Sequence, residues 1–141
     1  MANISGEWQV PCPVQLVWDV ITDQTRTAWR SDLKSLEPQE PGCYIEITKD
    51  GVASRVTVIA SEPCRRYAVQ VDGRDTCGIR ELLLTWDGTQ THITINNEVM
   101  GRTLFLGLME KLYLKEFQKR YLRDLNNELH RIVHGGTEHG A

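Results

Sequence analysis

Between residues 33 and 100 the sequence alternates apolar and polar side chains with a period of two, and turn residues interrupt it at short intervals. This period is typical of strands that bury one face. We expect strands at residues 4–10, 44–49, 52–60, 66–71, 79–86 and 91–100, with a shorter extended segment at 33–37. Asp50-Gly51, Asp72-Gly73 and Asp87-Gly88 lie between them, and Asp-Gly is a strong hairpin signal. Since parallel strands need long crossover connections, the short links predict an antiparallel meander.

Helices are expected on both sides of this meander. Pro13 suits the first position of a helix, where its missing N–H costs nothing. An apolar stripe at helical spacing follows, made of Val14, Val17, Trp18 and Ile21. After the capping residues Asp23 and Thr25, residues 26–30 are expected to form a second short helix.

The C-terminal part of the chain is predicted to form one long helix. Residues 103–133 contain no proline, and their apolar side chains fall on one side at 100° per residue. Gly135-Gly136 is expected to end this helix, and residues 135–141 are interpreted as a flexible tail. Residues 1–134 therefore form a single domain, which suits a chain of 141 residues.

Composition narrows the classes of function. Lys and Arg total 16 against 19 Asp and Glu, and this net charge of −3 argues against a nucleic-acid or anionic-membrane partner. No apolar run is long enough to span a bilayer, and no signal peptide is expected. The four cysteines are scattered singly, which favours reduced thiols and a cytoplasmic location. We expect no metal or cofactor, because neither these cysteines nor the pair His130 and His134 forms a known ligand motif.

The order of elements and two motifs resemble the START-like helix-grip superfamily (SRPBCC), including its polyketide cyclase/dehydrase-type proteins. The first motif is Pro13–Asp23, which reads P-V-Q-L-V-W-D-V-I-T-D, followed by Trp29. The second is Glu62–Tyr67, in which Cys64 replaces the usual second proline. The resemblance implies an α+β helix-grip fold, in which a curved antiparallel sheet wraps a long C-terminal helix and two short helices follow the first strand. It also implies a cavity between sheet and helix for small apolar or partly polar molecules.

Strand alternation predicts which side chains face that cavity. If the apolar face is the concave one, the inward residues are Trp8, Ile45, Ile47, Val56, Val58, Tyr67, Val69, Leu82, Leu84, Trp86, Ile93 and Ile95. The same alternation places Arg80 and Asn97 inward and places Glu46, Glu81 and Glu98 outward. A buried guanidinium is costly unless it is paired. Arg80 therefore either meets a partner or ligand inside, or reaches solvent along its stem from a strand end.

The apolar side of the long helix is interrupted at Lys111 and Gln118. Gln118 is expected to face the interior and to need a hydrogen-bond partner, whereas Lys111 can extend out of the cavity mouth. One amide and one basic group over an apolar cavity fit a mostly apolar ligand with one polar or anionic end. The candidate ligand-binding residues are Trp29, Tyr67, Arg80, Leu82, Leu84, Ile95, Asn97, Lys111, Leu114, Gln118 and Tyr121.

Three functions follow from this set. The first is binding of a small, mostly apolar ligand, lipid- or polyketide-like, without catalysis. The second is a cyclase- or dehydratase-type enzyme, in which Arg80, Asn97 and Gln118 orient carbonyls and Tyr67 or Asp32 carries a proton. The third is a protein-interaction module, for which the outward Ile59 and Leu83 offer a small contact patch. The inward set lacks a pair of acids, which favours the first. No oligomeric state is assigned.

Overall fold

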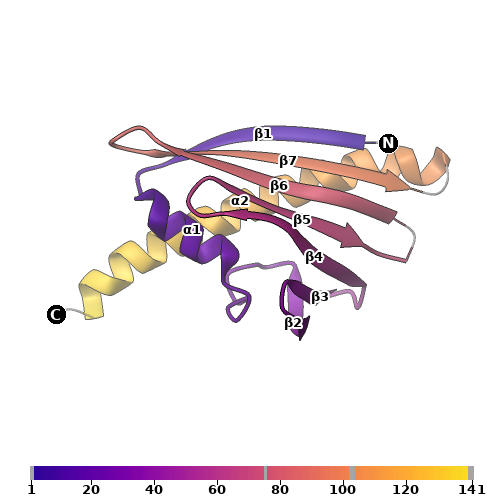
Figure 1. Ribbon diagram of the computed structural model, residues 1–141, viewed down its shortest axis with the longest axis horizontal. Coiled ribbons are helices and arrows are strands. Elements are labelled where there is room, and N and C mark those ends of the chain that lie inside the picture. The colour runs from indigo at the N-terminus through magenta and orange to yellow at the C-terminus, as the bar shows by residue number, and fades with distance from the viewer. Residues whose placement is uncertain (1, 75, 102–103, 140–141) are drawn as a thin grey trace.

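The sheet and the long helix of the protein lie against each other as two layers (Figure 1). The computed structural model describes residues 2–74, 76–101 and 104–139, with side chains described at 3–74, 76–99, 109 and 111–134. In chain order the elements are β1 (Ala2–Val10), α1 (Val14–Thr22), β2 (Leu33–Glu40), β3 (Cys43–Thr48), β4 (Ala53–Glu62), β5 (Arg66–Asp72), β6 (Thr76–Trp86), β7 (Thr91–Gly101) and α2 (Leu104–His139). No helix in the described ranges is long and apolar enough to cross a membrane.

The seven strands form one antiparallel sheet in the order β1-β7-β6-β5-β4-β3-β2. The six strands from β2 to β7 therefore form the expected meander, and β1 joins beside β7. The sheet is open and curved, and α2 crosses it diagonally toward the side where α1 lies (Figure 1). The α+β class, the antiparallel sheet and the long C-terminal helix are confirmed.

Only one of the two expected short helices is present. α1 begins at Val14, one residue later than expected, and Pro13 is its N-cap instead of its first helical residue. Residues 26–30 form turns instead of a helix. Asp23 accepts hydrogen bonds from the backbone and hydroxyl of Thr25, and Arg30 turns inward to Glu46. An isolated helical turn is costly to nucleate, and these bonds to other parts of the molecule replace it.

Two element ends also differ from expectation. β2 continues through Pro38 to Glu40, which is possible because β2 is an edge strand and needs no ladder bond on its free side. α2 continues through Gly135-Gly136 to His139, since glycine only weakens a helix interior by about 1 kcal/mol. Residues 140 and 141, and the side chains from residue 135 on, lie outside the described part, so the flexible tail at 135–141 stays a prediction.

Cross-strand register defines the concave face that packs on α2. Val69 pairs with Arg80 and Arg80 pairs with Asn97, so these three side chains share a face, as expected. Leu82, Leu84, Ile93 and Ile95 of β6 and β7 form the most buried part of this face. α2 covers it with Leu114, Phe117, Tyr121, Leu125 and Leu129, all buried. The core therefore lies where β6 and β7 meet the helix.

The predicted alternation of β3 is wrong. Tyr44 pairs with Val56 and Leu36 pairs with Glu46, so Tyr44 and Glu46 face inward, while Ile45 and Ile47 lie on the opposite face. The physical reason is charge: Glu46 is 5% exposed and accepts hydrogen bonds from two arginines, a pairing that outweighs the burial of two isoleucines. Trp8 and Trp86 share the inward alternation but are more than two-fifths exposed, because they lie beyond the core covered by the helices.

Candidate functional site

A group of buried charges lies under α2 where the inner faces of β3 and β6 meet the segment that follows α1. Arg30 Nη1 is 2.7 Å from Glu46 Oε2, and Arg80 Nη1 is 3.2 Å from the same oxygen. Arg30 Nη2 also lies 2.9 Å from Asp32 Oδ2. Two cations therefore meet two anions, which is the condition under which charged side chains can be buried. We call Arg30, Asp32, Glu46 and Arg80 the charge cluster.

The charge cluster holds its members ionised. Burial alone would raise the pKa of Glu46, but the charges and hydrogen bonds of Arg80 and Arg30 outweigh it and lower this pKa to about 2. Burial would likewise lower the pKa of both arginines, and the carboxylate of Glu46 raises it instead. Glu46 is therefore a permanent anion at neutral pH and has no proton to donate.

Aromatic rings of α2 cover the two guanidinium groups. The Arg80 guanidinium lies 4.5 Å from the centroid of the Phe117 ring. The Arg30 guanidinium lies 5.6 Å from Phe117 and 5.5 Å from Tyr121. Such stacking is favourable because the ring faces carry partial negative charge. The helix thus fixes both arginines from above while Glu46 fixes them from the sheet.

One polar atom of the charge cluster is left over. Arg80 Nε is buried and has no hydrogen-bond partner among the residues that the structure describes. Buried donors without a partner are rare, and each needs an explanation, such as a water or a ligand. Arg80 is also one of the residues that line a cavity of about 30 Å³, which holds about one water molecule.

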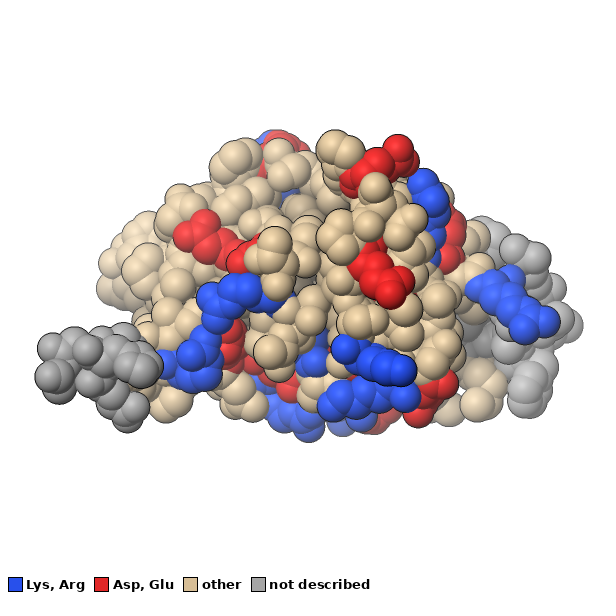
Figure 2. All heavy atoms as spheres, turned by 90° about the horizontal axis from the view of Figure 1, so that it is seen from below, with Lys and Arg blue, Asp and Glu red and all other residues tan. Residues whose placement is uncertain are grey.

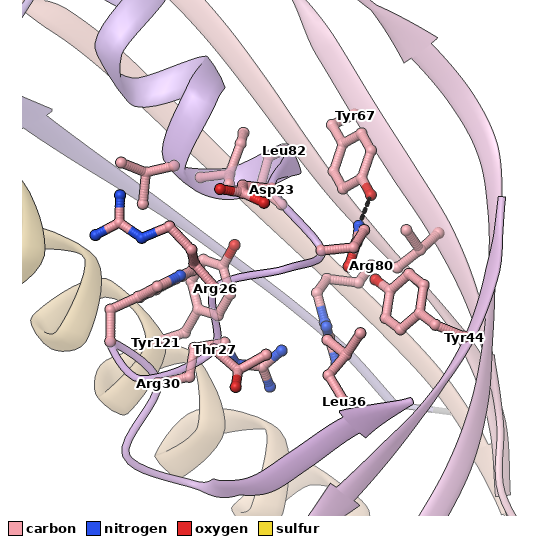
Figure 3. A pocket seen from close by; sticks show the side chains of 15 residues that line it. Asp23, Arg26, Thr27, Arg30, Leu36, Tyr44, Tyr67, Arg80, Leu82 and Tyr121 are labelled. Atoms are coloured by element: carbon pink, nitrogen blue, oxygen red, sulfur yellow. Dashed lines mark hydrogen bonds between the residues drawn. The ribbon is translucent and has the colours of Figure 1, made fainter. Parts of the chain in front are cut away.

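Three tyrosines, Tyr44, Tyr67 and Tyr121, belong to the polar part of the cavity wall. Gln24 donates a hydrogen bond to the Tyr67 hydroxyl, and Tyr44 lies beside it (Figure 3). Burial raises the pKa of Tyr67 and that of Tyr44 above the ordinary value. Burial also raises the pKa of Tyr121 to about 12. All three hydroxyls are therefore protonated at neutral pH and can donate hydrogen bonds.

The structure brings together five of the eleven candidate ligand-binding residues. Lining the cavity are Trp29, Tyr67, Arg80, Leu82 and Tyr121. Leu84, Ile95 and Leu114 are buried but line no described cavity, and Lys111 is exposed. Asn97 and Gln118 are buried and bond to each other, with Asn97 Nδ2 3.4 Å from Gln118 Oε1. The ligand-binding role of all eleven stays a prediction.

Several residues of the site are absent from the sequence-based set of ligand-binding residues, and four of them are central to it. Arg30, Glu46 and Tyr44 lie in or beside the charge cluster, and Gln24 closes the cavity over Tyr67. The signal that could have found Glu46 is the inward Arg80, which requires an anion. Asp32, considered above as a proton carrier, instead pairs with Arg30. No group of three or more His, Cys, Asp or Glu side chains that could hold a metal occurs within the described residues.

A second, larger hollow lies between β1 and α2. This groove has a volume of about 500 Å³ and shares no lining residue with the cavity. Gln118 is the only member of the candidate ligand-binding set that lines it. The described residues thus line a small cavity and, separate from it, a larger and more open groove.

Comparison with known proteins places the fold. No family profile matches the sequence, and no curated protein does. Among solved structures, a START superfamily protein from Mycobacterium smegmatis is 10% identical with a TM-score of 0.80, covering 92% of this chain and 98% of that one. A conserved protein from Geobacillus kaustophilus is 16% identical with a TM-score of 0.80, covering 92% and 96%.

A third similar structure comes from a biosynthetic locus. DynU16, a protein of the dynemicin biosynthetic locus, is 22% identical with a TM-score of 0.69. The match covers 92% of this chain but 48% of DynU16, so the chain spans about half of that protein. At these identities the likeness shows the fold alone, and the fold is START-like.

Proposed function

We propose that the protein binds a small, mostly apolar organic molecule, lipid- or polyketide-like, in the cavity between the sheet and α2. The polar end of the ligand lies at Arg80 and accepts a hydrogen bond from its Nε. The observation that carries this proposal is the buried Arg80 Nε without a partner among the described residues, at the wall of a cavity. A carbonyl or carboxylate oxygen there would remove the cost of the unpaired donor.

The rest of the cavity wall suits the same class of ligand. Trp29 and Tyr121 supply aromatic surface, with ring centroids 5.3 Å apart. Val69 and Leu82 supply aliphatic surface from the sheet. The hydroxyls of Tyr44 and Tyr67 add two donors close to Arg80 (Figure 3). Charged and polar side chains, Asp23, Arg26, Thr27 and Arg30 among them, form much of the remaining lining, and they suit the polar groups of such a ligand.

The ligand needs more room than the present 30 Å³, and residues 23–29 are the part that has to move. These residues have neither helix nor strand, and several of them line one side of the cavity. Gln24 ties them to Tyr67, and Arg26 ties them to Glu128 of α2. Beyond them, Arg30 stays in the charge cluster and Ser31 bonds to Asp124, so the movement ends at a fixed point.

Protonation favours binding over the alternative of a cyclase- or dehydratase-type reaction. General acid–base catalysis works best with a group whose pKa is near neutral. Here the pKa of Glu46 is lowered to about 2, while the pKa of Tyr67 is raised, so both move away from neutrality. DynU16, from the dynemicin biosynthetic locus, is compatible with a polyketide-like ligand under either function.

The test uses the four tryptophans as reporters. Trp29 lines the cavity, Trp8 lines the groove, Trp18 is in the core and Trp86 is exposed at a strand end. We expect 2-naphthoate, an aromatic carboxylate used as the probe, to shift the indole N–H signal of Trp29 in a ¹H–¹⁵N spectrum of the whole chain. The signals of Trp8 and Trp86 should stay in place.

Matched tyrosine variants then test the polar end of the site. Tyr67→Phe removes a hydroxyl at the cavity and should weaken binding of 2-naphthoate about fivefold. Tyr113→Phe removes an exposed hydroxyl from α2 and should leave binding unchanged. The proposal fails if Trp29 does not respond at saturating probe, or if both variants bind as the natural chain does.

A further inference from the structure

The groove between β1 and α2 has an apolar floor. Ile4 and Trp8 form its sheet side, and Leu112 and Leu122 form its helix side. Leu122 is buried, whereas Leu112 is 62% exposed and Trp8 is 42% exposed. Side chains of this size are normally covered, and several together mark a binding surface.

The rim of the groove is basic. Lys115, Lys119 and Arg123 line it at a spacing of four residues, so they form one row along α2. Glu116 is the one acidic residue of the lining, and Gln118 and Asn126 are its neutral polar members. Lys115 and Lys119 form no ion pair with any described residue. Arg123 Nη2 lies 3.6 Å from Asp124 Oδ1, and the same carboxylate also accepts a hydrogen bond from Ser31.

This positive row arises because α2 segregates its charges. Two of its acidic residues, Asp124 and Glu128, are buried and pair with Ser31, Arg26 and Arg131, whereas Glu116 is exposed. Its lysines Lys111, Lys115 and Lys119 remain exposed. Lys and Arg side chains also gather along the lower margin of the face in Figure 2, which is seen from the side opposite to β1. A protein with a net charge of −3 therefore still presents a local positive field.

We infer that the groove is a second ligand site, which binds a single amphipathic anion: an unbranched acyl chain that ends in a carboxylate. The chain lies on Ile4, Trp8, Leu112 and Leu122, and the carboxylate lies at Lys115 and Lys119. This site is independent of the cavity at Arg80, because no residue lines both. It also takes a different chemistry, since its two lysines form no ion pair with any described residue and its lining has no tyrosine hydroxyl.

The shape of the groove favours one chain over a bilayer surface. Leu122 and Gln118 at its floor are 8% exposed, and a flat lipid surface cannot reach them between β1 and α2. A narrow chain can. The volume of about 500 Å³ lies in the ordinary range for small-molecule sites.

Decanoate below its micelle concentration is the probe, and the indole N–H signal of Trp8 is the reporter. We expect decanoate to shift Trp8 and to leave Trp29 in place. Octanoate should bind roughly tenfold more weakly, because two buried methylenes are lost. Decanol should bind more weakly than decanoate, and a tenfold rise in salt should remove that difference.

Paired variants assign the head and the chain. Lys115→Gln with Lys119→Gln should weaken decanoate binding about fivefold, whereas Lys111→Gln, on the same helix but outside the groove, should not. Leu112→Gln should weaken binding, whereas Met109→Gln, at another exposed position outside the groove, should not. All five positions are exposed, so thermal melting should confirm that every variant folds.

The inference is overturned if decanoate shifts Trp29 instead of Trp8, or if Lys111→Gln weakens binding as much as the groove variants. Co-sedimentation with vesicles of phosphatidylcholine and phosphatidylglycerol in equal parts, without any response to monomeric decanoate, would assign the surface to a membrane and also overturn it. A failure at Trp8 leaves the response of Trp29 to 2-naphthoate untouched, so the two sites are judged separately.

Discussion

The two hollows of the protein lie on either side of α2 and use charge in opposite ways. At the charge cluster, each buried cation faces an anion, and Glu46 alone accepts from both arginines. At the groove, the cations of Lys115 and Lys119 are exposed and have no anionic partner among the described residues. The first arrangement stabilises the fold, and the second leaves charge available to a ligand.

This difference shows which groups of the charge cluster are free to bind a ligand. Paired and buried charges are costly to move, because separation leaves an uncompensated ion in a low dielectric. The four charged groups of the cluster therefore act as a rigid frame. What remains free for a ligand is the one donor that the frame does not use, Arg80 Nε.

The largest expected effect comes from removing the anion that the two arginines share. Glu46→Gln leaves Arg30 and Arg80 buried without their common partner, and should lower the free energy of unfolding by about 3–5 kcal/mol. Urea denaturation at neutral pH measures this change. Glu37→Gln, an exposed position on β2, is the matched control and should change it by less than about 0.5 kcal/mol. A loss below about 1 kcal/mol for Glu46→Gln would show that the charge cluster is not a structural frame.

The dependence of the unfolding free energy on pH tests the charge cluster without any substitution. The pKa of Glu46 is lowered to about 2 in the folded state, from an ordinary value of 4.5. Its stabilisation is therefore fully present above about pH 4.5 and is lost as the pH falls through about 2. The shift corresponds to about 3 kcal/mol. The difference in unfolding free energy between the natural chain and Glu46→Gln should therefore narrow as the pH falls from about 5 to about 2. A constant difference over this range would contradict a stabilising role of the ionised Glu46.

The strand pattern was predictable where local signals agree. Alternating apolar residues and Asp-Gly pairs specify β4 to β7 and their hairpins, because both signals act within a few residues. The alternation of β3 was not predictable in this way. Ile45 and Ile47 favour one face, but Arg80, 34 residues later in the chain, requires Glu46 on the other. A partner that distant leaves no trace in the local pattern.

The site was predictable to the same extent. Arg80 and Tyr67 follow from the alternation of β5 and β6, and their place at the cavity wall is visible in the structure. The turns at residues 26–30 depend on the bond of Ser31 to Asp124, 93 residues away, so a local helix signal misleads there. The basic row on α2 was not predicted, because the net charge of the whole chain does not show that acidic residues such as Asp124 and Glu128 are buried.

The smallest of these effects concerns the boundary between the two hollows. Gln118 lines the groove, bonds to Asn97 on the inner face, and packs so closely on Gly6 of β1 that any Cβ there would collide with its amide. Gly6→Ala should therefore lower the free energy of unfolding by about 1–2 kcal/mol, although alanine is ordinarily better than glycine in a strand. Gly73→Ala is the control: its Cβ would meet the Ser54 hydroxyl at 3.4 Å, an ordinary contact, and stability should stay nearly unchanged.

Combining Gly6→Ala with Gln118→Ala should recover part of the loss in a double-mutant cycle, because the colliding amide is gone. If the two changes are instead additive, Gln118 does not close the wall between the groove and the core, and the two hollows are not separated there.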